Sequence, residues 1–407
     1  MAATIFRAVL LASLVLLPPM TLLGSPAATV VLCLNALAAL TVIVPRGRTV
    51  PRSDAMPDRL MLAAVLALPA IGLVSAAWSP HAGESALRAL KLLLLVGAGL
   101  AVFVAARGPA RPNHRHMLIA IVLGLVLAAG LAMTDRFLLF EVLDDLEPGF
   151  QPRRGFYSRG ATVLLLFALL ATIGFDRLGR PGIAAIVYLG IGALVALKFR
   201  SGAAAMVWVL AGVAYLVWWA TRGRWRVGFA LLLSAVCLIA PLVVTMIPPP
   251  DPLHAANRAL PGSWSHRIVI WQFAAQRIAE RPLLGWGLDA ARRIPGGRAT
   301  IPWQMDPDPR DTDDRMSVVQ MMPLHPHSLA LQVWLELGLP GALALAVLAF
   351  LLVARAGRSE SSAATVALVY AGMAISNVSY GAWQTWWLST LMLVAAAAAA
   401  LSAAKDR

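Results

Sequence analysis

Charged residues are scarce in this chain of 407 residues: Asp, Glu, Lys and Arg make up 13% of it, whereas hydrophobic residues make up 59%. The mean hydropathy is +0.75. This composition excludes an ordinary soluble domain and is typical of a chain whose solvent is lipid, because charged side chains are costly inside a bilayer. The sequence therefore predicts a polytopic membrane protein with an all-α fold.

Cysteine is also scarce. The two cysteines, Cys33 and Cys237, both lie in long apolar runs. A pair placed in this way excludes a disulfide framework and a Cys-based metal site.

Long apolar runs define the architecture. A helix that crosses a bilayer needs about 20 mainly apolar residues, and such runs occur at about residues 6–24, 27–45, 59–78, 86–106, 116–134, 159–176, 182–199, 202–220, 226–247, 328–353, 362–379 and 384–402. The first run resembles the core of a signal peptide, but a second follows almost at once, so we expect the first to be retained as a transmembrane helix. The sequence thus predicts about twelve transmembrane helices, divided into helices 1–9 (residues 1–247), one long outer loop containing short helices (248–327) and helices 10–12 (328–407).

Basic residues predict the orientation. With the N-terminus inside, every short loop on the inner side is basic, for example at residues 46–59, 107–115 and 222–226. This is the pattern of cytoplasmic loops, so we predict that both termini are cytoplasmic. Half of the 34 Lys and Arg residues nevertheless fall on the outer side, where Arg88 and Lys91 are interpreted as contacts with phospholipid head groups.

Three further outer arginines at the membrane border are candidates for binding an anion. Arg154 and Arg159 come just before or at the start of the run at 159–176, and guanidinium forks match phosphate oxygens. A solvated loop that balances its own acids is the alternative interpretation. Arg200 lies in a very short connection between two runs, where an unpaired charge is costly, so it needs either a ligand or an acid such as Glu336 as its partner.

The outer loop contains one predicted amphipathic helix. Ser263 is its expected N-cap, and Pro282 ends it. Its apolar face, at three- and four-residue spacing, is predicted to consist of Trp264, Ile268, Trp271, Ala275 and Ile278. Docking at the membrane surface explains the tryptophans, whereas it does not explain Arg267 on a second face.

Five aspartates gather at residues 306–314 of the same loop. Closely spaced carboxylates can bind a divalent cation. This run, however, lacks the glycine turn of a calcium loop and is broken by prolines, which is more typical of a solvated segment. We expect no metal and no cofactor in this protein.

Two histidines, His325 and His327, stand where the outer loop meets the run that begins at residue 328. Ser328 is a natural N-cap, so the first amides and the positive end of the helix are expected to face the histidines. A neutral imidazole there is suited to take a proton from a hydroxyl. Surface histidines and metal ligands are the alternatives. Glu336 lies nine residues on, on the opposite side of the helix, and is expected to be a buried partner.

Arginines at the membrane border, a helix N-terminus and a candidate base together suit an anionic, lipid-linked substrate and a neutral nucleophile. Pyrophosphate is a good leaving group once its charge is neutralised, so glycosyl transfer from a polyprenyl pyrophosphate fits. A transporter or channel for anionic lipids is the alternative from another class. It would require charged or broken helices at mid-membrane, and the predicted helices are nearly free of charge at their centres.

Several motifs resemble those of the O-antigen ligase and polymerase superfamily. Residues 327–341, HSLALQVWLELGLPG, are similar to its signature of His, a small polar residue, Leu-Gln and Glu-x-Gly-x-x-Gly. Residues 263–271, with Ser, Arg and Trp at four-residue spacing, and residues 282–287, PLLGWG, resemble two further motifs. Arg-Gly-Phe-Tyr at 154–157 resembles an Arg-Gly-aromatic element. Residues 200–202 read Arg-Ser-Gly where the family usually has Ser-Arg-Gly, so the residue order differs there.

The resemblance implies metal-independent, inverting transfer of a glycan from undecaprenyl pyrophosphate on the periplasmic side of the bacterial inner membrane. It implies that His327 activates the acceptor hydroxyl while Arg200 and Arg267 hold the pyrophosphate. We assign Arg154 and Arg159 to the phosphates of the donor or acceptor, and His325 to a neighbouring role in substrate binding. The expected partners are the undecaprenyl-pyrophosphate-linked glycan donor, a lipid A-core acceptor and membrane lipids, with no nucleic acid.

The choice within the superfamily rests on the outer loop. Polymerases often carry, in their outer loops, an arginine, ten further residues and then glycine, and no arginine in the outer loops of this chain has glycine at that offset. A single dominant loop of modest length is also more like the ligases. We therefore favour an O-antigen ligase, with an O-antigen polymerase or a protein O-oligosaccharyltransferase of the same superfamily as alternatives.

Overall fold

The computed structural model describes residues 1–44, 57–134, 154–199, 201–254, 257–304 and 316–402, without the side chains of residues 154–157. Within these residues the chain forms 13 α-helices and one small two-stranded sheet. Nine of the helices are apolar and long enough to cross a membrane. The prediction of an all-α, polytopic membrane protein is confirmed.

A helix lies at each of the twelve predicted transmembrane runs. These helices are α1 (Ala2–Leu23), α2 (Ala27–Ile43), α3 (Arg59–Ser75), α4 (Ala82–Arg107), α5 (His114–Met133), α7 (Arg154–Arg177), α8 (Pro181–Leu194) with its π-helical extension η1 (Val195–Phe199), α9 (Gly202–Ala220), α10 (Arg226–Thr245), α12 (Leu329–Ala356), α13 (Ser362–Val378) and α14 (Thr385–Ser402). Helices α2, α3 and α13 have 17 residues each, near the lower limit for crossing a bilayer.

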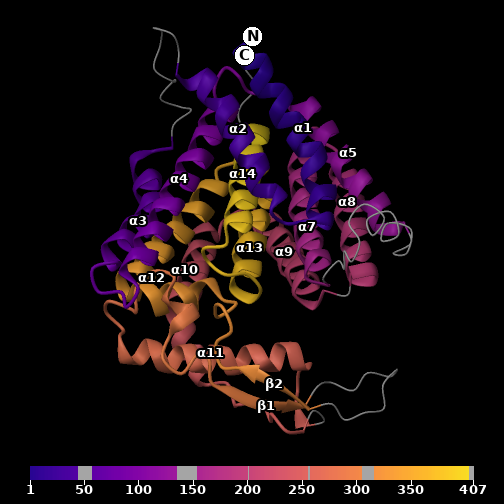
Figure 1. The fold of residues 1–407 in the computed structure, drawn as a ribbon. Helices are drawn as coiled ribbons and strands as arrows, with labels where there is room; N and C mark the ends of the chain where they lie inside the picture. Colours follow the sequence, from indigo (N-terminus) through magenta and orange to yellow (C-terminus); the bar gives the residue numbers. More distant parts are fainter. Residues whose placement is uncertain (45–56, 135–153, 200, 255–256, 305–315, 403–407) are drawn as a thin grey trace, which may run out of the picture.

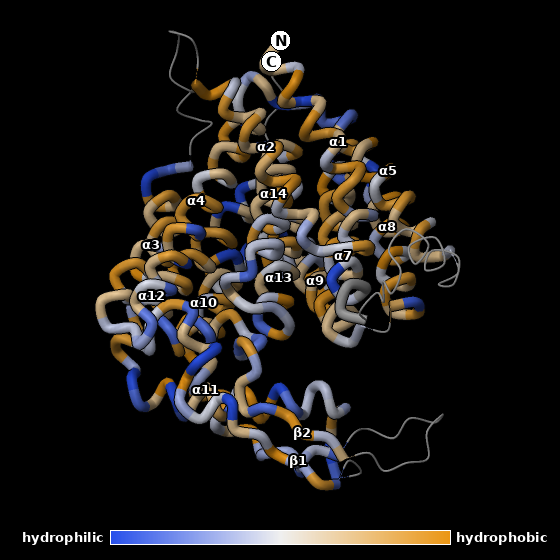
Figure 2. Tube along the Cα trace, in the orientation of Figure 1, coloured by the Kyte–Doolittle hydropathy of each residue, from blue (hydrophilic) through white to orange (hydrophobic). Residues whose placement is uncertain are grey.

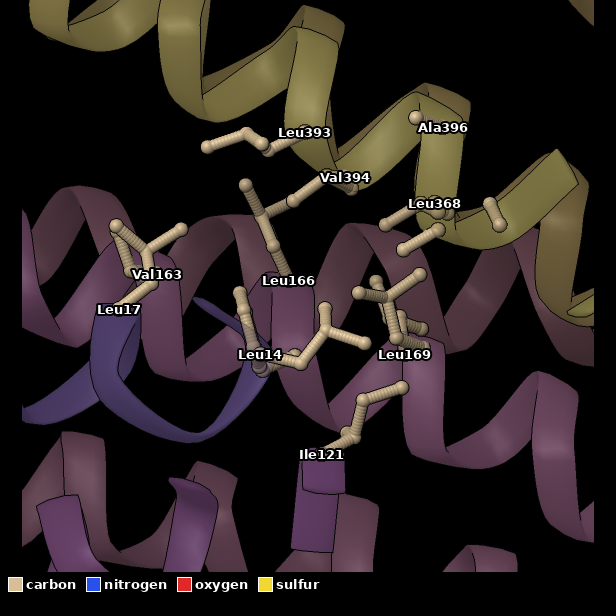
Figure 3. Close-up of a cluster of buried hydrophobic side chains, with 14 of the residues drawn as sticks. Leu14, Leu17, Ile121, Val163, Leu166, Leu169, Leu368, Leu393, Val394 and Ala396 are labelled. Carbon is tan, nitrogen blue, oxygen red and sulfur yellow. The ribbon is translucent and has the colours of Figure 1, made fainter. Parts of the chain in front are cut away.

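Helix α7 lies at the centre of the bundle. From Gly160 to Gly174 it contains no charged residue, and its side chains are buried on all sides rather than along one stripe. Figure 3 shows leucines of α7 between side chains of α1, α5 and α14, such as Leu14, Ile121 and Leu393. Because lipid tails are as apolar as leucine, this association is stabilised mainly by close van der Waals packing.

Helices α8 and α10 lie at the lipid-facing surface of the bundle. Large apolar side chains such as Ile186 on α8 and Leu242 on α10 are exposed. Figure 2 shows this apolar character along most of the bundle and a more hydrophilic layer at the end that carries α11. The surface that would be unfavourable in water is therefore the one that lipid covers.

The outer loop forms that end layer. It contains α11 (Gly262–Glu280), the 3-10 turn η3 (Ala290–Arg293) and the antiparallel strands β1 (Thr300–Gln304) and β2 (Met316–Gln320). In Figure 1, α11 and the strands lie across one end of the bundle, and both chain termini lie at the opposite end. The apolar side chains that join α11 to α10 and α12 include Val244, Ile270, Phe273, Ile278, Leu331 and Leu335.

Helix α11 differs in detail from the helix predicted for this loop. It begins at Gly262 with Pro261 as N-cap, so the prediction of Ser263 as N-cap was wrong. The carbonyl of Pro261 accepts hydrogen bonds from the amides of Trp264 and Ser265, each at 2.9 Å, so the first turn of the helix forms before Ser263 could cap it. The buried face is also rotated. Of the predicted apolar positions it keeps Ala275 and Ile278, and it adds Ile270, Phe273 and Ala274.

Helix α12 is broken at Gly338, which has φ 61° and ψ −156°. The Pro-Leu-Leu-Gly-Trp-Gly segment, residues 282–287, pairs with the backbone at this break. The amides of Trp286 and Gly287 donate to the carbonyls of Leu335 (2.9 Å) and Glu336 (2.8 Å), and Leu339 donates to Pro282 (2.9 Å). These bonds satisfy polar backbone groups that a break would otherwise leave unpaired in lipid.

Replacing Gly285 with Ala is expected to destabilise this junction. Gly285 has φ +68°, and an added Cβ would lie 2.5 Å from the carbonyl carbon and oxygen of Glu336. Backbone strain of this kind costs on the order of 1–3 kcal/mol, so the midpoint of thermal unfolding in detergent should fall. Gly182→Ala is the matched control, since nothing lies within 4 Å of its added Cβ. Equal midpoints for the two variants would contradict the close pairing.

Candidate active site

The two predicted histidines lie in the connection between β2 and α12. Ser328 caps α12, accepting a hydrogen bond from the amide of Leu331 at 3.4 Å, as predicted. The amide of Ala330 donates to Oδ1 of Asn377 at 2.9 Å. Two amides of the first turn are thus already satisfied by side chains, so arginine side chains, rather than free helix amides, are the main cationic groups at this corner.

His327 is held in one orientation and one tautomer. Its backbone has φ 55°, a left-handed conformation that is unusual for a residue with a side chain. Its Nδ1 lies 2.7 Å from the carbonyl oxygen of Ser379. Because a carbonyl only accepts, Nδ1 carries the proton, and Nε2 of the neutral ring has the free lone pair. This is the arrangement that a general base requires.

The pKa of His327 is lowered from its ordinary value. Burial is the main cause, with the positive charge of Arg267 and the neighbouring His266 as further causes, and the hydrogen bond to Ser379 opposes them. Since protonation is disfavoured, the ring is neutral at pH 7 and available to accept a proton.

His325 is buried beneath this ring, with the two ring centroids 4.3 Å apart. Its Nδ1 accepts a hydrogen bond from the amide of His327 at 3.1 Å, and its Nε2 lies 3.1 Å from the side-chain amide of Gln384. Burial lowers its pKa to about 3, followed in effect by His327 and by three arginines. Both ring nitrogens therefore have protein partners, and the geometry makes His325 a support for the His327 backbone.

Two predicted arginines lie near this pair. Arg267 projects from α11 with its guanidinium carbon 5.0 Å from the ring centre of Trp264, and burial lowers its pKa. No carboxylate pairs with it among the described residues. Arg159, on α7, donates to Oγ of Ser25 at 2.7 Å. Arg267, a partly buried cation with no carboxylate partner among the described residues, is a favourable place for an anionic ligand.

The connection between α13 and α14 supplies residues that the sequence-based reasoning missed. Besides Ser379 and Gln384, it contains Tyr380, whose hydroxyl lies 2.8 Å from Oγ1 of Thr162. Burial raises the pKa of Tyr380 to about 12, against the effect of Arg159 and Arg267. The sequence signal for these residues was the run of polar and aromatic side chains Ser-Tyr-Gly-Ala-Trp-Gln at residues 379–384. A connection this short between two transmembrane helices holds its side chains close to the end of the bundle.

Glu336 is fully buried, as predicted, but its partners are neutral donors. Its Oε2 accepts from Trp383 Nε1 at 2.6 Å and from the amide of Asp289 at 2.5 Å. Its Oε1 accepts from Gln332 Nε2 at 3.0 Å and from the amide of Ala291 at 3.4 Å. One carboxylate thus joins α12, the outer loop and the α13–α14 connection, without an ion pair among the described residues.

Other predicted groups have a different outcome. Arg200, the side chain of Arg154 and the acidic run at 306–314 lie outside the described part of the chain. The interpretation of Arg88 as a head-group contact was wrong, because it pairs with Asp289 of the outer loop at 2.9 Å. A specific acid in the loop outcompetes diffuse lipid contact there. Lys91 is exposed.

The fold and this geometry define a polytopic membrane protein with a histidine–arginine site between the bundle and its end layer. Residues 184–346 of the chain match the family model described as O-Antigen ligase. That range includes His325, His327, Arg267 and Glu336, and excludes Arg159 and the α13–α14 connection.

Distant relatives carry a related name. The chain is 28% identical to a "Putative polysaccharide ligase" of Rickettsia conorii over 57% of this chain and 54% of the relative. For proteins with the same description, identity is 31% in Rickettsia prowazekii, over 37% of this chain and 35% of the relative, and 25% in Rickettsia typhi, over 68% and 65%. The match to the first of these relatives spans about half of its length.

Proposed function

We propose that this protein is an O-antigen ligase that transfers a glycan from undecaprenyl pyrophosphate to a sugar hydroxyl of lipid A-core oligosaccharide. The observation that carries the proposal is the orientation of His327: the hydrogen bond from Nδ1 to the Ser379 carbonyl leaves the lone pair on Nε2. Arg267, which has no carboxylate partner in the described part of the chain, lies close enough to lower the pKa of this histidine. The match of residues 184–346 to the O-antigen ligase model supports a lipid-linked glycan as donor.

In the proposed reaction, Nε2 of His327 takes the proton of the acceptor hydroxyl as its oxygen attacks the anomeric carbon of the donor. The bond from that carbon to the phosphate oxygen breaks, and undecaprenyl pyrophosphate leaves with the electron pair. Direct displacement inverts the anomeric centre. Guanidinium groups neutralise the leaving group, so the reaction needs no metal; the proton passes from the imidazolium to solvent afterwards.

The arginines divide this work by position. We assign Arg267 and Arg200 to the pyrophosphate. Support comes from the start of α9, where an added Cβ at Gly202 would lie 3.2 Å from Nε1 of Trp264, the ring beside which Arg267 lies. Arg154 and Arg159 are assigned to further substrate phosphates and His325 to the support of His327. Bidentate guanidinium groups suit phosphate oxygens better than a lysine would.

The proposed site is the periplasmic face of a bacterial inner membrane, with both termini in the cytoplasm. Support for this orientation comes from the basic loops and from the position of both termini at the end of the bundle opposite α11 (Figure 1). An even number of crossings also returns the chain to its starting side.

A reconstituted assay tests the function. Purified protein in liposomes is given an undecaprenyl-pyrophosphate-linked glycan with lipid A-core, the donor alone, or the donor with a protein acceptor, each with and without EDTA. We expect a product only with lipid A-core, and an unchanged rate in EDTA. Chain growth with donor alone would instead indicate a polymerase, and modified protein an oligosaccharyltransferase. If no arm gives a product, the alternative that the protein transports anionic lipids would have to be considered again.

A further inference from the structure

The connection between α13 and α14 contacts both histidines of the site. The carbonyl oxygen of Ser379 accepts from Nδ1 of His327 at 2.7 Å. Two residues further on, Gly381 lies against His325, because a Cβ added to this glycine would be 2.8 Å from Cδ2 of the imidazole. Tyr380 stands between these two contacts. Its placement therefore determines how the connection meets the histidine pair.

Tyr380 is coupled to the Ser379 carbonyl by covalent geometry. The carbonyl of one residue and the amide nitrogen of the next belong to one planar peptide group, so the backbone turns only about the φ and ψ angles on either side of that plane. A movement of the Tyr380 α-carbon therefore turns the plane that contains the carbonyl. Because this carbonyl orients the His327 ring, a bond that fixes Tyr380 also fixes the direction of the lone pair on Nε2.

The hydroxyl of Tyr380 is bonded to helix α7. The side chain is buried, and its hydroxyl lies 2.8 Å from Oγ1 of Thr162 and 3.4 Å from the carbonyl oxygen of Ser158. Thr162 donates its own hydrogen to the Ser158 carbonyl at 3.1 Å. Since a hydroxyl has one hydrogen, Tyr380 is the donor to Thr162. The phenol hydrogen is thus directed at α7, which suits a group that positions others rather than one that reacts.

The ring of Tyr380 is held by aromatic contacts. It packs edge-on against Trp386, with ring centroids 4.8 Å apart, and it lies 4.9 Å from the ring of Trp387. The guanidinium carbon of Arg159 lies 5.4 Å from the ring centre of Trp386, and Arg159 precedes Thr162 by three residues on α7. One cluster therefore joins the orienting connection to the part of α7 that carries a proposed phosphate ligand.

The same part of α7 is bonded to the start of α9. Oγ of Ser158 lies 3.1 Å from Oγ of Ser201, which is the N-cap of α9. Ser201 follows Arg200 in the sequence, the residue that we assign to the pyrophosphate. Tyr380 is thus connected, directly or through Ser158, to both of these helix starts.

We propose that Tyr380 is a positioning residue for the transfer reaction: its bond to Thr162 holds the Ser379 carbonyl, and through it the His327 ring, in a fixed position relative to the starts of α7 and α9. The base then meets the acceptor hydroxyl in line with a donor that the arginines hold. This inference rests on the proposed function for its catalytic meaning, but the orientation of the imidazole does not depend on turnover.

Tyr380→Phe removes the hydroxyl and keeps the ring, and Tyr370→Phe is the matched control. Tyr370 of α13 donates its hydroxyl to the carbonyl of Phe229 on α10 at 2.7 Å, so each variant loses one hydrogen bond between helices. In the reconstituted assay we expect Tyr380→Phe to lower kcat about tenfold or more, since misplacement of a reacting group by about 1 Å can cost on the order of 100-fold in rate. KM for the lipid-linked donor should change little, and Tyr370→Phe should keep the wild-type kcat.

Thr162→Val tests the bond itself, because it removes the acceptor and changes the size of the side chain little. The double variant with Tyr380→Phe should lose no more kcat than Tyr380→Phe alone, since both substitutions remove the same interaction. Losses of kcat that multiply in the double variant would show that the two residues act separately and would overturn the proposal.

A measurement without turnover separates this inference from the proposed function. In protein that carries isotope-labelled nitrogen in histidine, the ring signals of His327 are identified in the NMR spectrum by their loss in His327→Ala. The wild-type signals should show the proton on Nδ1. Tyr380→Phe should add the tautomer with the proton on Nε2, and Tyr370→Phe should not.

The two results are interpreted together. A changed tautomer in Tyr380→Phe supports the positioning role even if wild type transfers no glycan, in which case the transfer reaction alone fails. An unchanged His327 tautomer in Tyr380→Phe would overturn the role of Tyr380, and so would a wild-type kcat of this variant in an active preparation.

Discussion

Replacing His327 with Ala is expected to reduce kcat for glycan transfer by about 10²- to 10⁴-fold, the contribution typical of a positioned general base. The ring is partly buried, and its Nδ1 is bonded to Ser379, so Nε2 is the atom left to receive a proton. The donor should still bind, because Arg267 is untouched. Binding and single-turnover measurements on proteoliposomes would therefore show a loss in the chemical step, with little change in the affinity for the lipid-linked donor.

The pH dependence carries the same signature. A base must be unprotonated to work, so the rate falls as pH falls through the pKa of His327. Burial and Arg267 lower that pKa, which places the acidic limb of kcat/KM below about pH 6.5, the ordinary value for histidine. When the anionic donor offsets the charge of Arg267, the pKa rises, so the limb of kcat should lie at higher pH than that of kcat/KM.

A second histidine provides the control. His254 is an exposed residue of the outer loop that pairs with Asp251 at 3.1 Å, so His254→Ala should retain wild-type rates and the wild-type pH profile. Full activity of His327→Ala under the same conditions would eliminate the proposed base. An acidic limb that persists in that variant would assign the titration to another group.

Residues 159–176 and the other long runs were predictable because the bilayer constrains them directly. A span must be about 20 apolar residues long and must satisfy its backbone internally, so composition and length are sufficient to locate it. The N-cap Ser328 was predictable for a similar reason, since a serine at the start of a helix accepts a hydrogen bond from an amide of the first turn, which is a purely local interaction. Ser263 shows the limit of local reasoning: the N-cap is Pro261, two residues before the predicted one, and the helix begins at Gly262.

The contacts that shape the site are between segments far apart in the sequence, and no local pattern encodes them. Arg88 and Asp289 are 201 residues apart, and Glu336 and Trp383 are 47 apart. The sequence motifs include Gly285 and Gly338, but the sequence alone does not explain why glycine is needed at these positions. The structure supplies the reason, because each glycine lies where a Cβ would meet the backbone of the other segment at 2.5 Å. The two motifs therefore form one backbone junction.

The strands were also unpredicted. Strands β1 and β2 pair Ile301 with Val319 in an antiparallel register, yet they flank the acidic run that drew attention as a possible cation site. Five-residue strands in a loop give little periodic signal, and Pro302 within β1 argues against a strand except at an edge. A sheet of two strands consists only of edges, so the proline is tolerated there.

Replacing Glu336 with Gln is the second substitution expected to have a large effect. Each carboxylate oxygen accepts hydrogen bonds from two N–H groups. In glutamine one of these oxygens is replaced by an NH₂ group, which is itself a donor and cannot accept from the two N–H groups it would meet. A buried donor without an acceptor costs about 1–3 kcal/mol, so the loss of unfolding free energy should be on the order of 3 kcal/mol. Glu280→Gln is the control, since Glu280 forms an exposed pair with Arg277 and its replacement should change stability little.

The Glu336→Gln variant should also lose activity, because the hydrogen bonds of Glu336 hold the connection between α13 and α14 in place. Trp383 and Ala382 are bonded to Glu336 and Gln332, and the same connection carries the Ser379 carbonyl that orients His327. If this connection shifts, kcat should fall about 10- to 100-fold, in line with the loss of groups that orient a reactive side chain, while the donor KM is nearly unchanged. Loss of the Ser379 bond also removes an influence that raises the pKa of His327, so the acidic limb should move to lower pH.

Adding Trp383→Phe to the Glu336→Gln variant distinguishes a specific network from general damage. Phenylalanine removes one of the donors that the amide nitrogen would face, so the double variant should lose less stability than the sum of the single variants. A purely structural defect would leave the two effects additive and the pH profile unmoved. Coupling in stability together with a shifted acidic limb would show that a fully buried carboxylate, remote from any reacting atom, sets the geometry of the proposed base.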